Sequence, residues 1–417
     1  MHRVLLLVPS ASYRAPDFLD AARTLGIEVI VGCEEAPVLG ENGASVQVPL
    51  HDPAAAADAI VALDAATPLD AVVAVDDQGT LTAALASERL GLRSNRSGAV
   101  AAARDKLRMR QMLSKAEVSQ PAFASLRPGA DESEQAHLAE MVGLPCVVKP
   151  TSLSGSQGVI RADTIAEVLA AVGRTRAIAA GAGADPAEPI LLEGFVPGPE
   201  VAVEGMLSAG ELSVLAIFDK PDPLDGPYFE ETLYVTPSRL AKGDLGAVEA
   251  ATQAATRALG LTEGPVHAEL RVRAGRAFVI EVAARSIGGL CSRTLKFGTG
   301  TTLEHLILAH ALGRDARRIK MPGAAGVLML PIRAAGRLVE VSGRKDALAI
   351  AGIAGLEMTI APGRPLVPLP EGNRYLGFVF ARAESPEEVE AALRAAMATL
   401  RVRVRPLQPL RHLAAGR

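Results

Sequence analysis

Two glutamates stand on either side of a short turn in HAELRVRAGRAFVIEVAAR, residues 267–285. Polar and apolar residues alternate in this segment as they do along β-strands, and Ala274–Gly275 predicts the turn of a hairpin. The hairpin would place Glu269 beside Glu281, and like charges that face each other across two strands are destabilising. A hard divalent cation would neutralise them, and Mg²⁺ commonly binds one or two carboxylates together with substrate phosphates.

Two arginines give this pair of acids a second interpretation. Arg271 and Arg285 could neutralise the acids in an ordinary ion-pair network, and the residue types alone leave both interpretations open. Arg285 also precedes SIGGL, where the Gly288–Gly289 backbone could cradle a carboxylate or an oxyanion. An arginine at this place could clamp a phosphate in transfer. A glycine-rich turn at the end of a strand is the structural alternative.

A lysine ends the apolar run of VVKPTSLSGSQGV, residues 147–159, and a loop of small residues follows it. Glycine and serine allow backbone N–H groups to converge on one anion. The lysine precedes the loop, so the segment is not a Walker A motif. The loop alone favours a surface turn, whereas Lys149 at the end of an apolar run needs a partner and favours a phosphate ligand.

Two further acids flank a predicted bend. Glu193 ends PILLE and Glu200 follows GFVPGP. A strand–hinge–strand segment can offer backbone N–H and C=O groups to an adenine edge and a carboxylate to ribose hydroxyls. An ordinary β-bend would have the same sequence, so both interpretations stay open here.

Composition excludes several classes of function. The 417 residues carry 43 Lys+Arg and 47 Asp+Glu, a net charge of −4, and 3% aromatic residues. This predicts no basic surface for nucleic acid and no stacking platform for single strands. Three widely spaced cysteines fit a reducing compartment. The N-terminus predicts a strand rather than a signal peptide, and no apolar run reaches the ~18 residues of a membrane helix, so we expect a cytoplasmic protein without membrane contact.

The first ~100 residues alternate buried strands with helices, which predicts a doubly wound parallel sheet. RVLLLVP (3–9), EVIVGC (28–33) and DAVVAVDD (70–77) are the strands, and APDFLDAARTLGI (15–27) is a helix. The first strand is not followed by G-x-G-x-x-G, so we expect no dinucleotide site there. One long helix is expected over residues 99–116. Further expected elements are helices at 133–143 and 164–180, a strand at 144–150, paired strands over 190–220, short strands from about 320 to 405, a last helix at 385–400 and an edge strand at 401–406.

The order of the motifs resembles that of the ATP-grasp superfamily over about residues 70 to 310. No single motif is diagnostic, but five in this order are specific. The C-terminal part, which begins GAAGVLMLPIRAAGRLVEVSG, looks like the C-terminal domain of the L-amino acid ligases. In chain order the five motifs are RDK (104–106), VVKP with its loop, LLEGFVPGPE (191–200), HAEL (267–270) and VIEVAARSIGG (279–289).

The resemblance implies an ATP-grasp fold, of mixed α/β and α+β class, in three parts. The N-terminal α/β domain would span residues 1–100, the ATP-grasp core 101–315 with a lid subdomain at about 118–195, and the ligase-type domain 316–417. It implies an ADP-forming ligase that joins a carboxylate to an amine through an acyl phosphate, making a dipeptide or a natural-product amide. Ligation or carboxylation of another substrate class (purine-biosynthesis or biotin-carboxylase-like) and a non-catalytic ATP-binding regulator are the alternatives.

The resemblance also implies ATP and Mg²⁺, with Mn²⁺ as a substitute, small-molecule substrates, and a homodimer by analogy. Ala283 stands where many members carry a metal-binding Asn, which leaves the number of metal ions open. His267 is expected to be a core histidine that faces away from Glu269. Lys220 could approach the phosphates, but most such lysines are solvated, and we expect the same of Lys220. The implied roles are phosphate binding for Lys106 and Lys149, phosphate covering for Ser154, Gly155, Ser156 and Gly158, the adenine hinge for Glu193, Phe195 and Val196, ribose binding for Glu200, metal binding for Glu269 and Glu281, catalysis for Lys149, Arg285, Gly288 and Gly289, and substrate contact for Glu231, Tyr234 and Arg285. For Glu231 and Tyr234 the alternative is a structural loop packed by Tyr228 and Phe229.

Overall fold

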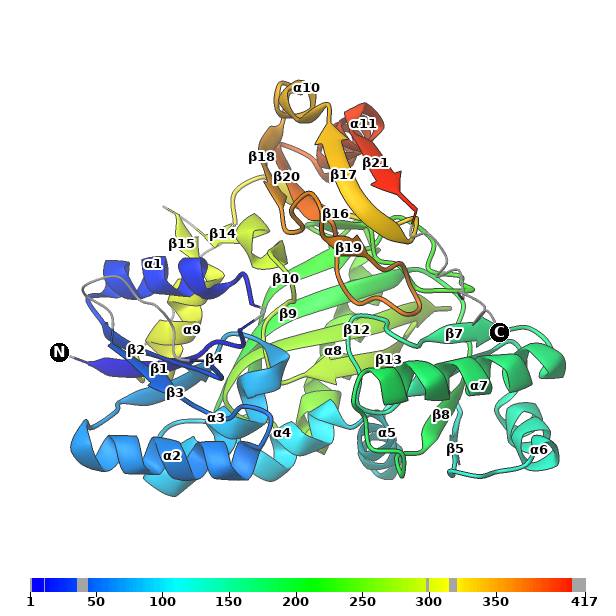
Figure 1. Ribbon diagram of the computed structural model, residues 1–417, viewed down its shortest axis with the longest axis horizontal. Coiled ribbons are helices and arrows are strands. Elements are labelled where there is room, and N and C mark those ends of the chain that lie inside the picture. Colours follow the sequence, from blue (N-terminus) through cyan, green and yellow to red (C-terminus); the bar gives the residue numbers. More distant parts are fainter. Residues whose placement is uncertain (1, 11, 36–43, 298–299, 315–320, 407–417) are drawn as a thin grey trace, which may run out of the picture.

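The computed structural model describes residues 2–10, 12–35, 44–297, 300–314 and 321–406. Four described strands form a parallel sheet in the order β3-β2-β1-β4. Along β1, Val4 and Leu6 pack with α1, whereas Leu5 and Leu7 pack with α2 and α3, so helices cover both faces (Figure 1). The predicted doubly wound sheet is confirmed. Its elements are β1 (Arg3–Leu7), α1 (Ala15–Leu25), β2 (Glu28–Cys33), β3 (Ala44–Gln47), α2 (Pro53–Ala66), β4 (Ala71–Ala74) and α3 (Asp77–Leu90).

The single long helix expected over residues 99–116 is wrong. The structure has two helices, α4 (Ser97–Arg104) and α5 (Lys106–Lys115), which meet at Asp105. Asp105 has an extended backbone, and its carboxylate accepts hydrogen bonds from the N–H groups of Leu107 and Arg108. An aspartate used as an N-cap starts a new helix, and this places Lys106 at the first position of α5.

Four described strands form a second, antiparallel sheet in the order β5-β8-β6-β7, which we call the lid sheet. Its strand β6 is buried along its whole length and ends in Lys149 and Pro150. Residues 151–159 then lead to β7, and α6 and α7 complete the lid. The elements are β5 (Phe123–Leu126), α6 (Glu132–Val142), β6 (Cys146–Pro150), β7 (Ile160–Ala162), α7 (Ile165–Gly181) and β8 (Ile190–Gly194).

Eight described strands form the central sheet, in the order β13-β12-β9-β10-β11-β16-β20-β18. All of its neighbouring strands are antiparallel, and α8 (Lys242–Leu259) packs against β13. The sheet runs without a break from the expected core into the expected C-terminal domain. Its strands are β9 (Glu200–Ser208), β10 (Glu211–Asp219), β11 (Leu233–Thr236), β12 (Gly264–Arg273), β13 (Arg276–Ala283), β16 (Ala324–Leu330), β18 (Ile353–Met358) and β20 (Gly377–Ala383).

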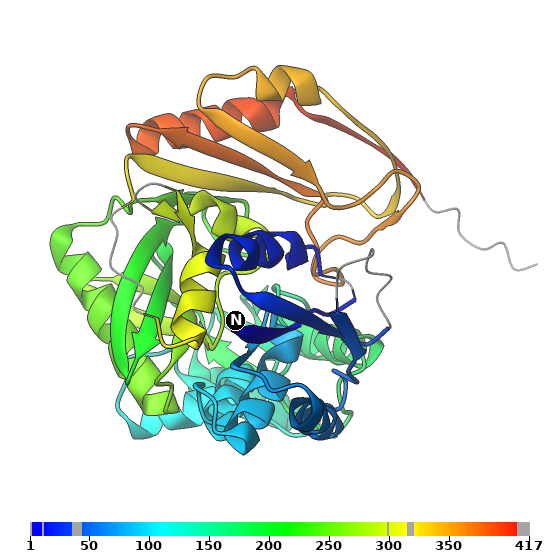
Figure 2. The same ribbon diagram turned by 90° about the vertical axis from the view of Figure 1, so that its left-hand side faces the viewer.

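The C-terminal part adds a small sheet in the order β19-β17-β21, and Figure 2 shows this part, together with the central-sheet strands β16, β18 and β20, at the top of the molecule. β21 (Arg401–Arg405) pairs with β17 and exposes its arginines, as expected of an edge strand. Among the described residues, no helix is both long and apolar enough to cross a membrane. The remaining elements are β14 (Lys296–Phe297), β15 (Thr301–Thr302), α9 (Leu303–Ala311), β17 (Gly336–Ser342), α10 (Arg344–Leu348), β19 (Pro365–Leu366) and α11 (Pro386–Thr399).

Candidate active site

A pocket lies between the lid sheet and the central sheet, and most of the predicted nucleotide and metal residues line it. Lys106 reaches it from α5, Lys149 from β6, and Glu269 and Glu281 from the β12–β13 hairpin. Of the predicted site residues, those that line the pocket are Lys106, Lys149, Ser154, Gly155, Ser156, Glu193, Phe195, Val196, Glu200, Glu231, Glu269 and Glu281. Gly158, Tyr234, Arg285, Gly288 and Gly289 lie outside this lining as far as the described residues go.

Glu269 and Glu281 are direct cross-strand partners in the hairpin, as predicted. The alternative, that they pair with Arg271 and Arg285, is wrong. Arg271 Nε donates to Glu200 Oε2 at 2.7 Å, and Arg285 Nε lies 3.5 Å from Asp77 Oδ1. Two carboxylates on one pocket wall opposite two lysines offer hard oxygen donors, the ligands that Mg²⁺ prefers.

A buried arginine that the sequence analysis missed shares Glu193 with Lys149. Glu193 is buried and its two oxygens bind different cations, Lys149 Nζ at 2.6 Å and Arg110 Nε at 2.6 Å. Burial alone would raise the pKa of Glu193, but Arg110 and Lys149 outweigh it and lower the pKa to about 2. Arg110 follows Lys106 by four residues on α5, and this helical spacing was the available signal.

Lys106 joins residues 151–159, which we call the lid loop, to the pocket wall that carries Glu281. Its Nζ donates to the carbonyl oxygen of Leu153 at 2.6 Å and lies 3.6 Å from Glu281 Oε2. The loop bends through left-handed residues, with φ of 64° at Gly155, 56° at Ser156 and 73° at Gly158. Glycine at two of these positions avoids the strain that a side chain would add.

The C-terminal part holds the outer side of this loop, which the sequence analysis did not foresee. The Gly158 N–H donates to Pro370 O at 2.8 Å, and Gln157 Nε2 donates to Glu371 O at 2.8 Å. Asn373 Nδ2 donates to Gln157 Oε1 at 3.3 Å. The lid loop therefore lies between the pocket and a segment more than 200 residues later in the chain.

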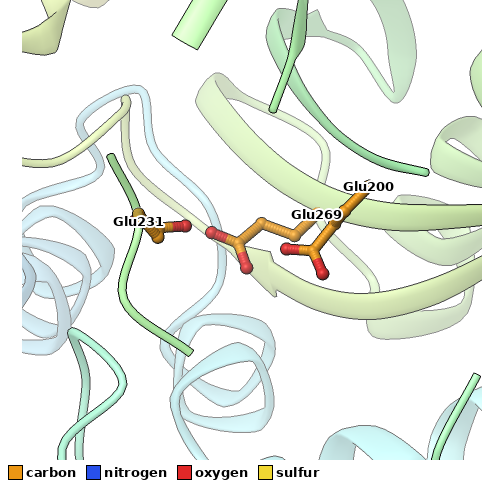
Figure 3. Close-up of side chains that lie close together, drawn as sticks. All are labelled: Glu200, Glu231 and Glu269. Atoms are coloured by element: carbon orange, nitrogen blue, oxygen red, sulfur yellow. The ribbon is translucent and has the colours of Figure 1, made fainter. Parts of the chain in front are cut away.

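Three acids from separate segments of the pocket lining point toward one another (Figure 3). One carboxylate oxygen from each of Glu200, Glu231 and Glu269 lies within 4.8 Å of the others. Lys220 Nζ lies among them, 2.7 Å from Glu200, 2.5 Å from Glu231 and 3.3 Å from Glu269. Lys220 is buried, so the expectation that it is solvated is wrong. Burial opposes its charge, but the three carboxylates raise its pKa well above the usual value.

The predicted substrate residues Glu231 and Tyr234 contact each other. The Tyr234 hydroxyl donates to Glu231 Oε1 at 2.6 Å, and the hydroxyl of Tyr375, from the C-terminal part, lies 3.3 Å from Glu231 Oε2. Burial raises the pKa of Glu231. Glu231 therefore brings its loop into the lining of the pocket, where Lys220 links it to Glu200 and Glu269.

The expectation that His267 faces away from Glu269 is wrong, because residues two apart in a strand share a face. His267 Nε2 lies 3.3 Å from Glu269 Oε1, and His267 Nδ1 lies 2.5 Å from Glu204 Oε1. Burial would lower the pKa of His267, but Glu204 and Glu269 raise it to about 9. Glu204, which the sequence analysis did not single out, also accepts a hydrogen bond from the Ile287 N–H at 2.9 Å.

Arg285 and the loop after it face the N-terminal sheet. Arg285 lies near Asp77, one of the two acids predicted at the end of the β4 strand. Arg14 binds the same loop, since its Nη2 donates to Ser286 Oγ at 2.8 Å. Gly289 has φ of 62°, and a Cβ there would lie 2.8 Å from the Phe378 ring, so the loop requires glycine at this position. The loop therefore lies where the N-terminal, central and C-terminal parts meet.

Comparisons with known proteins agree with this architecture. Residues 19–93 match the ATP-grasp N-terminal domain family, 142–294 the ATP-grasp domain family, and 328–405 the L-amino acid ligase C-terminal domain 2 family. The chain belongs to the ATP-grasp superfamily. Its fold is an ATP-grasp fold with an N-terminal domain and an L-amino acid ligase C-terminal domain, as predicted.

This ATP-grasp protein superposes on the crystal structure of an L-amino acid ligase from Bacillus licheniformis with a TM-score of 0.81. The two are 26% identical, over 97% of this chain and 99% of that one. It is 30% identical over 257 residues to alanine–anticapsin ligase of Bacillus subtilis (strain 168), covering 56% of this chain and 52% of that protein. It is 30% identical over 161 residues to dapdiamide A synthase of Enterobacter agglomerans, covering 38% and 37%. The chain spans about half the length of the first of these curated relatives.

Proposed function

We propose that this chain is an ATP-dependent, ADP-forming ligase that joins the carboxylate of one amino acid, or amino acid-like compound, to the amine of another. One observation carries the proposal. The cross-strand pair Glu269 and Glu281 shares a pocket with Lys106 and Lys149, in a chain with an L-amino acid ligase C-terminal domain. That domain favours amino acid ligation over the purine-biosynthesis and biotin-carboxylase-like alternatives.

The proposed reaction has two steps. The γ-phosphoryl group of ATP passes to the substrate carboxylate, giving ADP and an acyl phosphate. The amine then attacks the acyl carbon and forms the amide while phosphate leaves. The chain contributes position and charge rather than a covalent intermediate. Lys106 and Lys149 would hold phosphate oxygens from the lid, and Glu200 would bind the ribose.

Glu269 and Glu281 would hold Mg²⁺, which when bound neutralises phosphate charge as a Lewis acid. Mn²⁺ is expected to substitute for it. Arg285 and the backbone N–H groups at Gly288 and Gly289 would stabilise the oxyanion that forms when the amine attacks. A donor aimed at such an oxyanion contributes about 2.7–4 kcal/mol.

The lid loop would keep water away from the acyl phosphate, since hydrolysis would waste ATP. Glu231 and Tyr234 would contact the amine substrate or a side chain. Glu231 lines the pocket and accepts a hydrogen bond from the Tyr234 hydroxyl, which supports this role.

A screen of amino acid pairs tests the proposal. Purified protein, ATP and Mg²⁺ are incubated with each pair, released phosphate is measured, and the product is identified by mass. We expect at least one pair to give a condensation product with equal amounts of ADP and phosphate, and the Glu281→Gln variant to give neither. ATP binding without turnover for every pair would favour the non-catalytic alternative, and full activity of Glu281→Gln would overturn the metal assignment.

A further inference from the structure

A buried chain of contacts connects the metal-binding wall to the glycine-rich loop. It begins at Glu269, passes through His267 and Glu204, and ends at the backbone N–H of Ile287. Ile287 lies between Ser286 and Gly288, inside the loop that would stabilise the oxyanion. The two halves of the proposed site therefore share a set of side-chain contacts.

The central sheet holds this chain of contacts in place. Glu204 on β9 and His267 on β12 are direct cross-strand partners, so their side chains share a face. Glu204 is 0% exposed and His267 is 6% exposed. Each Glu204 oxygen has its own partner, Oε1 with His267 and Oε2 with the Ile287 N–H. A buried carboxylate with both oxygens engaged has little freedom to move.

We propose that Glu204 and His267 are positioning residues of the ligase reaction. His267 orients the Glu269 carboxylate toward the metal ion. Glu204 holds the loop at Ile287 in position relative to that carboxylate. The inference rests on the proposed function. Side chains that orient a metal ligand commonly change metal affinity or activity by about 10–100-fold when they are replaced.

The chain offers a matched control for a merely structural role. His310 on α9 is also buried and also pairs with a glutamate, since its Nε2 lies 3.0 Å from Glu263 Oε2. The same Nε2 atom also lies 3.1 Å from the backbone nitrogen of Gly264. Loss of this pair removes a buried histidine–carboxylate contact without touching Glu269 or the loop at Ile287.

The experiment compares the full-length variants His267→Asn, Glu204→Gln and His310→Asn with the unmodified chain. The first readout is Mn²⁺ affinity in the presence of ADP, measured by electron paramagnetic resonance. The second is kcat and KM for ATP with a substrate pair from the screen. Thermal unfolding identifies any variant that does not fold, and the isosteric Glu204→Gln is the variant expected to fold if His267→Asn does not.

We expect His267→Asn to weaken Mn²⁺ binding about 10-fold or more, and His310→Asn to leave it unchanged. Glu204→Gln should lower kcat more than it changes KM for ATP, because the loop acts on the transition state. The double variant should lose less than the product of the two single losses, because the residues act as one unit. Equal behaviour of His267→Asn and His310→Asn in both readouts would overturn the proposal.

The Mn²⁺ measurement needs no turnover, so it distinguishes failure of the positioning role from failure of the proposed ligase function. If no amino acid pair reacts but His267→Asn still weakens Mn²⁺ binding, the proposed ligase function fails while the positioning of Glu269 stands. If the unmodified chain is an active ligase and both variants match it, only the positioning role fails.

Discussion

The ammonium of Lys220 lies 2.5 Å from the carboxylate of Glu231. This ion pair joins the segment before β11 to the nucleotide pocket, because the same ammonium also contacts Glu200 and Glu269. A group of three carboxylates that could hold a metal ion thus already contains a cation from the chain itself. A metal ion is therefore expected on the Glu281 side of Glu269 rather than among the three acids.

Replacing Lys220 by Met should remove the cation from among Glu200, Glu231 and Glu269. Removing one partner of a buried ion pair typically costs about 3–5 kcal/mol, so the variant should have a lower free energy of unfolding. The three carboxylates should then bind one additional Mn²⁺ ion without nucleotide, and Mn²⁺ should raise the melting temperature of the variant more than that of the unmodified chain.

The matched variant Lys220→Arg keeps the positive charge and should gain no Mn²⁺ site. Mn²⁺ stoichiometry by electron paramagnetic resonance checks both variants. An unchanged stoichiometry in Lys220→Met, with unchanged stability, would show that Lys220 does not act as the cation of this group.

The Glu193 carboxylate should contribute a stability that depends on pH. Its pKa falls from 4.5 to about 2 on folding, because the charges of Arg110 and Lys149 outweigh burial. A carboxyl with a lowered pKa stabilises the fold above pH 4.5, and this contribution disappears as the pH falls through about 2.

The test compares the unmodified chain with Glu193→Gln by urea unfolding between pH 6 and pH 3. The difference in the free energy of unfolding should be largest at pH 6 and shrink toward pH 3. Glu211→Gln breaks an exposed pair with Arg257, and such pairs contribute little, so this control should show a small difference at every pH. A Glu193→Gln difference that does not change with pH would contradict the account.

Contact with the C-terminal part should keep the lid loop closed. Replacing Gln157 by Ala removes its hydrogen bonds to Glu371 and Asn373. The loop should then open more often and let water reach the acyl phosphate. We expect the ratio of released phosphate to amide product to rise above one.

Ser152→Ala is the matched control within the same loop. Ser152 Oγ donates to Glu188 Oε2 at 2.6 Å, and both residues belong to the lid. Loss of this hydrogen bond should leave the ratio of phosphate to amide product near one. Phosphate and product are quantified in the same reaction. If the two variants give the same ratio, the C-terminal segment has no part in closing the lid.

Local patterns predicted the elements that carry the site. The turn at Ala274–Gly275 and the alternation around it were sufficient to place Glu269 beside Glu281. The apolar run before Lys149 predicted a buried strand. Both features depend on neighbours in the sequence, which is why sequence reasoning reached them.

Contacts between residues that are distant in sequence could not be predicted from local sequence patterns. Arg110 binds Glu193 across 83 residues, and Gln157 binds Glu371 across 214 residues. The expectation that Lys220 is solvated was wrong because Glu200 on β9, Glu269 on β12 and Glu231 in the loop before β11 all contact it. The helix break at Asp105 depends on whether an aspartate caps a helix or continues one, which periodicity does not decide. The error at His267 was one of strand geometry, because a spacing of two already places both side chains on one face.

Transfer of oxygen from substrate to phosphate tests the central claim most directly. An amino acid labelled with ¹⁸O in its carboxylate is incubated with ATP, Mg²⁺ and the amine partner found in the screen. An acyl phosphate passes one carboxylate oxygen to the released phosphate and leaves the other in the amide. The account predicts one ¹⁸O in each phosphate that accompanies ADP, as measured by mass spectrometry. Product formed with unlabelled phosphate, or with ¹⁸O in AMP, would contradict it.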